Sequence, residues 1–143
     1  MASVTRPPRI EENIPIMLLS AHSGLRYLVL LLGLVVAGYA AYGLIAKRPY
    51  DKRMRILSTL FTATLDLQVV IGLAYLFTST FYAQLAGHLT MMVLAVAITH
   101  IVSAVQRRRP LEQRTYGPHV VGTLVVLAIV SFGIMALGRP VLG

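Results

Sequence analysis

The sequence has 143 residues, of which 57% are hydrophobic and only 13% are charged, and its mean hydropathy is +0.75. Soluble domains carry about 25% charged residues, so this composition excludes a soluble globular domain and predicts an integral membrane protein. The chain has no cysteine, which excludes disulfides and thiolate metal sites, and its net charge of +8 lies in short clusters between apolar runs, which argues against a nucleic-acid partner.

The N-terminal region combines a polar tail with a long apolar run. Residues 1–15 are polar and contain prolines but lack the apolar core of a cleaved signal peptide. The first apolar run, about 16–46, is longer than a bilayer requires and predicts a tilted transmembrane helix. His22 and Arg26 lie in the outer part of this helix, one turn apart.

The middle of the chain predicts two further transmembrane helices. The second run, about 56–77, is interrupted by Asp66, and the third run, about 87–105, carries His88 at its start and His100 well inside. Ionisable side chains are costly inside the hydrocarbon region, so we expect Asp66 and His100 to face other helices.

The fourth run, about 119–137, follows the basic segment 106–118. Pro118 suits the first turn of this helix, because the first backbone N–H groups have no partner within a helix. His119 opens the run, and we expect it at the membrane interface.

The positions of the basic residues predict the topology. The basic segments 47–55 and 106–118 flank the same side of the membrane, whereas the loop between the second and third runs has no Lys or Arg. The positive-inside rule therefore predicts both termini on the outer, periplasmic side of a bacterial inner (plasma) membrane. Short loops make consecutive helices antiparallel, so we expect an all-α, four-helix transmembrane up-and-down bundle as a single domain.

The polar residues of the second and third helices predict a buried cluster. Asp66 lies eleven residues from Phe77 and His100 lies twelve from His88, so the two side chains are nearly level in the membrane. Thr62 is one turn from Asp66 on the same helix face. We expect Asp66, His100 and Thr62 to form a buried polar cluster, because an unpaired carboxylate is unfavourable in hydrocarbon.

A second constellation lies nearer the outer surface. Two imidazoles on facing helices, an apolar environment and a nearby cation are what haem b requires for bis-histidine ligation between transmembrane helices. His22 and His88 are the predicted axial ligands, and Arg26 is the predicted partner of a haem propionate.

Three segments resemble a family of small bacterial four-helix membrane proteins commonly labelled cytochrome b-like: AHSGLRYLVLLLGL, LDLQVVIGLAYLF and GHLTMMVLAVAITHI. Members of that family carry H-S-G-L-R-W/Y, T-H-x-Q-L-x-x-G and E-H-x-x-M-M motifs. By this resemblance His22, His88 and His100 correspond to family histidines, whereas Asp66 stands where the family usually has histidine. The resemblance implies haem b electron transfer, and the departure at Asp66 argues against a second, inner haem.

Three functions fit the sequence. The first is an electron-transfer protein with one outer haem b. The second is a non-catalytic accessory subunit that packs against other transmembrane subunits of a respiratory or photosynthetic complex. The third is a small proton- or ion-handling protein built on Asp66 and His100. Hydrolase, transferase and nucleotide-binding chemistry have no support, because the sequence has neither a glycine-rich phosphate loop nor a nucleophile at helical spacing from a base.

Overall fold

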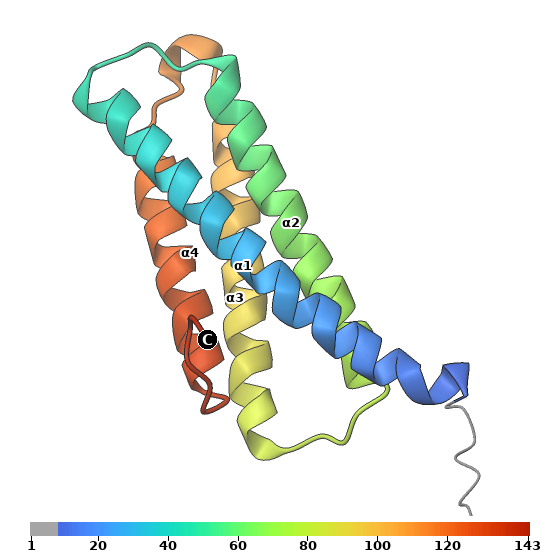
Figure 1. Cartoon of the computed structure of the whole chain (residues 1–143). Coiled ribbons are helices and arrows are strands. Elements are labelled where there is room, and N and C mark those ends of the chain that lie inside the picture. Colours follow the sequence, from blue (N-terminus) through green and yellow to red (C-terminus); the bar gives the residue numbers. More distant parts are fainter. Residues whose placement is uncertain (1–8) are drawn as a thin grey trace, which may run out of the picture.

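A computed structural model describes residues 9–143 and shows an all-helical fold (Figure 1). The elements are α1 (Ile10–Ile45), α2 (Lys52–Leu76), α3 (Ala83–Arg108), the short 3-10 helix η1 (Leu111–Gln113) and α4 (Gly117–Met135). No strand occurs among these residues. The four α-helices are each long and apolar enough to cross a membrane. The chain is therefore a multi-pass membrane protein, and the predicted four-helix bundle is confirmed.

The helices alternate in direction, so the connections lie at two opposite ends (Figure 1). The α1–α2 loop and the α3–α4 connection lie at what we call the basic-loop end. The α2–α3 loop and the C-terminus lie at what we call the neutral-loop end, because residues 77–82 contain no Lys or Arg. α1 packs along α2 and α4, α3 packs along α4, and α2 contacts α3 less closely.

Each helix begins before the apolar run that predicted it. α1 begins at Ile10, so the last six residues of the expected polar tail are helical, and Glu11 and Glu12 lie in its first turn. Acidic side chains are favourable there because a helix N-terminus carries partial positive charge. The rest of the tail, residues 1–8, lies outside the described residues.

The basic-loop end shows how local signals set the helix boundaries. α2 begins after Asp51, whose carboxylate accepts a hydrogen bond of 2.9 Å from the Met54 backbone N–H. Such an N-cap satisfies one of the unpaired N–H groups of a first turn. α3 continues through Arg107 and Arg108, which are favourable beside the partial negative charge of a helix C-terminus. Pro118 lies at the start of α4, as predicted.

Apolar side chains and close helix contacts form the interior between the two ends. A Cβ atom on Gly33 of α1 would lie 2.5 Å from Leu127 Cδ2 of α4, and one on Gly122 of α4 would lie 2.6 Å from Val102 Cγ2 of α3. Glycine therefore permits close approach at both contacts, as in other membrane helix pairs. The core contains these buried residues: Val29, Val36, Ala40, Met54, Phe61, Leu65, Met92, Ala95, Tyr116, Val126, Val130 and Ile134.

Candidate functional site

A cavity of about 180 Å³ lies among the four helices at the neutral-loop end. Its lining includes His22 and Arg26 from α1, His88 from α3 and Gln68 from α2. The three residues predicted as a haem site thus line one cavity, although they come from helices far apart in the sequence.

The hydrogen bond of His22 defines the proton on its ring. His22 Nδ1 lies 3.1 Å from the backbone carbonyl oxygen of Gln68. A carbonyl can only accept, so Nδ1 carries the proton, and in the neutral ring Nε2 keeps its lone pair. Gly72 makes this contact possible, because a Cβ atom there would lie 2.8 Å from His22 Cε1.

His88 has the same arrangement on the other side of the cavity. Its Nδ1 atom lies 2.9 Å from the carbonyl oxygen of Gly133, in the last turn of α4, and its side chain is buried. Carbonyls in the last turn of a helix have no partner within the helix, so His88 satisfies one that would otherwise be unpaired. The neutral His88 ring therefore also keeps a lone pair on Nε2.

The two imidazoles lie close to each other. Their ring centres are 6.2 Å apart, and the ring planes are inclined by 81°. A metal ion between two imidazoles, with bonds of about 2 Å, separates the ring centres by about 6 Å. No group of three or more His, Cys, Asp or Glu side chains in the described part of the chain could hold a metal ion. His22 and His88 are therefore a pair of nitrogen donors at a spacing compatible with one metal ion.

Gln68 is a site residue that the sequence analysis did not identify. Its Nε2 donates to the backbone carbonyl of His22 at 2.8 Å and lies 3.5 Å from His22 Nε2. Its Oε1 atom is buried without a hydrogen-bond partner among residues 9–143. The sequence did contain a signal for this position. Gln68 lies about 200° around α2 from Asp66, so it faces the inside of the bundle when Asp66 faces the outside.

Two arginines lie at the end of the cavity. Arg26 Nη2 donates to the Tyr27 hydroxyl at 2.8 Å and to the Gly143 carbonyl oxygen at 3.0 Å. Its Nε atom is buried and has no partner in the part of the chain that the structure describes. Arg139, which the sequence analysis did not single out, also lines the cavity and is exposed. The neutral-loop end therefore offers two cations to an anionic ligand.

The cavity reaches the outer surface of the bundle between α2 and α3. Leu73 of α2 and Val93 of α3 both line it, yet they are 42% and 63% exposed. The cavity is therefore open toward the lipid-facing surface between these two helices.

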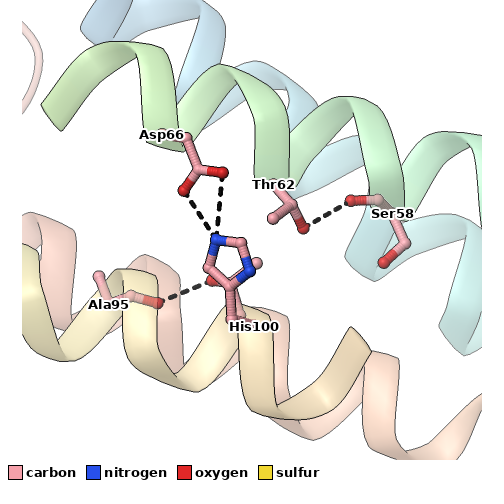
Figure 2. A network of polar contacts seen from close by, with 6 residues as sticks. Ser58, Thr62, Asp66, Ala95 and His100 are labelled. Atoms are coloured by element: carbon pink, nitrogen blue, oxygen red, sulfur yellow. Dashed lines mark hydrogen bonds and ion pairs between the residues drawn. The ribbon is translucent and has the colours of Figure 1, made fainter. Parts of the chain in front are cut away.

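The predicted inner cluster forms only in part (Figure 2). Asp66 of α2 and His100 of α3 form an ion pair, with His100 Nε2 lying 2.9 Å and 3.1 Å from the two carboxylate oxygens. Thr62 does not join them, because its hydroxyl donates to the Ser58 carbonyl at 2.9 Å.

The expectation that this pair is buried is wrong. The Asp66 side chain is 41% exposed and that of His100 is 49% exposed. The pair bridges α2 and α3, which contact each other less closely than the other neighbouring helices, and it lies on the outer side of that contact. Within residues 9–143 the two side chains hydrogen-bond only to each other.

His119 lies in the first turn of α4, and its side chain is buried within the protein, with only 2% exposed. Its Nε2 lies 3.0 Å from the Tyr50 hydroxyl, and the two rings stack with centres 5.7 Å apart. Burial raises the pKa of Tyr50 above its ordinary value, so its hydroxyl is a neutral hydrogen-bonding group in this contact. Tyr50 therefore packs over the start of α4 and encloses His119.

Other tyrosines complete the packing at the basic-loop end. The Tyr116 hydroxyl donates to the Pro49 carbonyl at 3.0 Å, and the Tyr39 hydroxyl donates to Asp51 Oδ2. Burial opposes the charge of Asp51, but hydrogen bonds from Tyr39 and the Met54 N–H outweigh it and hold the pKa of Asp51 below its ordinary value. These contacts tie both connections at this end to the helices.

Comparisons with known proteins do not test the predicted family, so the cytochrome b-like family stays a prediction. No family model matches the sequence, and no curated protein or solved structure is significantly similar to it.

Proposed function

We propose that this protein is a small membrane electron carrier that holds one haem b between His22 and His88. The observation that carries the proposal is the pair of Nδ1–carbonyl hydrogen bonds, to Gln68 and to Gly133. Metal-ligating histidines usually donate their other ring N–H to such an oxygen, which fixes the tautomer and the ring orientation. Both rings meet this requirement at one cavity, with a spacing that suits one metal.

The residues around the cavity fit the rest of the group. Apolar side chains form most of the lining, and Arg26 and Arg139 lie at the end nearest the membrane surface, where they would hold the propionates. Haem b would supply a one-electron iron couple, and two histidine ligands leave no open position for a substrate. His22 and His88 would set the potential through their hydrogen bonds, while the apolar lining excludes water.

We further propose membership of the cytochrome b-like family, with a single haem. Asp66 occupies a position where that family usually has histidine, and here its carboxylate pairs with His100. A carboxylate in that position is a poor replacement for an axial imidazole, so the proposal includes no inner haem.

An absorption spectrum tests the proposal. The protein, purified in detergent after expression with added haem, should show a Soret band and, after dithionite reduction, the sharp α-band of a low-spin haem b. A His119→Ala variant should keep both bands. Absence of a Soret band in the haem-supplemented wild type would refute the proposal and favour the accessory-subunit function.

The proposed location is a bacterial inner membrane with both termini on the periplasmic side. The arginines and lysines of the basic-loop end support this orientation, because basic loops are retained in the cytoplasm. A reporter that is active only in the periplasm should function when fused after Gly143 and fail when inserted after Arg109. The reverse pattern would overturn the orientation.

A further inference from the structure

The Asp66–His100 pair is poorly matched to a surface made of lipid. Asp66 lies fourteen residues from the start of α2 and ten from its end, near the middle of a membrane-spanning helix. About half of each side chain is exposed there. Lipid tails offer no hydrogen bonds, and intramembrane charged residues almost always face protein or a water-filled cavity. This face of the bundle therefore requires a polar neighbour.

The surroundings of the pair allow another helix to approach closely. Ala63 lies three residues before Asp66 on α2, and Ala97 lies three residues before His100 on α3, so each is on the same helix face as its charged neighbour. Both alanines are exposed. Small residues around a polar group are typical of transmembrane helix contacts, because backbones can then approach and hydrogen bonds can form between helices.

The face around Asp66 and His100 is self-complementary, because each of the two groups can meet the opposite group of a second copy. Two copies inserted in the same direction can be related by a two-fold axis along the membrane normal, which keeps every residue at its own depth. Asp66 and His100 are at the same depth, since their side chains touch. An axis beside the pair therefore puts the carboxylate of each copy opposite the imidazole of the other copy.

The hydrogen-bonding capacity of the pair agrees with this arrangement. Nε2 of His100 contacts both oxygens of Asp66, which leaves Nδ1 for another contact. A carboxylate can accept about four hydrogen bonds, so Asp66 retains capacity after binding its own His100. Two copies would form a closed ring in which carboxylates and imidazoles alternate.

We propose that the α2–α3 face around Asp66 and His100 is a docking surface for a second copy of this chain, with the two ion pairs meeting at the two-fold axis. This face lies opposite the α1–α4 contact. Docking there removes both ion pairs from lipid.

Cysteine cross-linking gives the first test, because the natural chain has no cysteine. Ala97→Cys and Ala63→Cys are the test variants, and Leu34→Cys on α1, at a position 62% exposed, is the matched control. Oxidation of native membranes should convert most of at least one test variant into a disulfide-linked dimer of this chain and leave the control monomeric. Cross-linking at a rate equal to that of Leu34→Cys, or only to a different protein, would overturn the proposal.

A charge exchange gives the second test and keeps the pair within each chain. The double variant Asp66→His with His100→Asp should still dimerise with itself, because both charges move together. In a mixed dimer with the wild type, however, like charges would face each other across the axis, and such contacts disfavour the wrong partner.

The measurement is the fraction of mixed dimers when the two forms, each with Ala97→Cys and with different tags, are expressed together. We expect this fraction to be several-fold below that of random pairing. Random pairing, or dimers that persist unchanged in an Asp66→Ala, His100→Ala variant, would show that the ion pairs do not form the contact. A visible spectrum of each variant confirms folding independently if haem binds, and circular dichroism does so if it does not.

Discussion

The two ends of the bundle use histidine in opposite ways. At the basic-loop end, His119 is enclosed, and its Nε2 atom contacts the Tyr50 hydroxyl. At the neutral-loop end, His22 and His88 each use Nδ1 on a backbone carbonyl and line a cavity. The comparison shows that burial alone does not mark a ligand. The distinguishing feature is a backbone carbonyl that accepts the Nδ1 proton of each of these two rings, beside a cavity that both side chains line.

The two ends also differ in packing. Tyr39, Tyr50 and Tyr116 fill the space at the basic-loop end, with neighbouring ring centres 5.5–6.3 Å apart. At the neutral-loop end, Gly72 leaves room for the ring of His22, and Gly133 leaves room for Met92 beside His88. One end is therefore filled by aromatic side chains, and the other contains a cavity. The following predictions test this difference from the largest effect to the smallest.

The largest expected effect is the loss of haem from the neutral-loop end. His22→Ala or His88→Ala should abolish the reduced α-band, because each variant removes one of two axial ligands. His119→Ala should retain the band per molecule of protein while lowering thermal stability in detergent. Loss of the band in His119→Ala but not in His22→Ala or His88→Ala would show that haem binds at the basic-loop end instead.

The space beside His22 gives the next prediction. In Gly72→Ala the new methyl group would lie 2.8 Å from His22 Cε1 and displace the ring. Changes in groups that orient a metal ligand cost about 10–100-fold in affinity, so haem affinity should fall by about tenfold or more. Gly38→Ala is the control, because nothing lies within 4 Å of the added Cβ there. A haem titration followed at the Soret band measures the affinity of both variants. Equal affinities would contradict the role of Gly72 in making room for the His22 ring.

At the basic-loop end, Tyr50→Phe should lower stability without changing the spectrum. The variant leaves the buried Nε2 of His119 without its hydroxyl partner, which costs about 1–3 kcal/mol. Tyr42→Phe removes a hydroxyl from an exposed side chain and should change stability by less than about 0.5 kcal/mol. Unfolding of the purified protein by SDS provides the measurement. Similar values for the two variants would show that the Tyr50–His119 contact contributes little.

The smallest expected effect concerns the cap of α2. Removal of an N-cap acceptor costs about 1 kcal/mol, so Asp51→Ala should lower stability by about that amount at pH 7. Because the folded-state pKa of Asp51 is lowered, its stabilising charge is present above the unfolded pKa and is lost as pH falls through the folded pKa. The difference between wild type and Asp51→Ala should therefore shrink below about pH 4. A difference that stays constant down to pH 2.5 would contradict this contribution.

Periodicity and depth predicted much of the candidate site. His22, Arg26 and His88 were identified because each lies near the outer end of an apolar run. An α-helix has a constant rise per residue, so residues at the same distance from the membrane surface lie at the same depth on different helices. Asp66 and His100 were matched by the same reasoning. Gln68 was missed, because depth does not give the rotation of a helix about its axis. Arg139 was missed because it lies in the segment after α4, whose path the apolar pattern does not predict.

The sequence by itself determined the class, the number of spans and the levels of the polar groups. These follow from local hydrophobicity, since a helix in lipid must satisfy its own backbone and match the bilayer thickness. Only the tertiary structure decided which faces meet: that His119 is enclosed by Tyr50, that Thr62 binds Ser58, and that the Asp66–His100 pair lies at the surface. The physical reason is that lipid-facing and interior helix surfaces are both apolar, so hydrophobic pattern does not fix helix rotation, which side-chain packing and hydrogen bonds between helices decide.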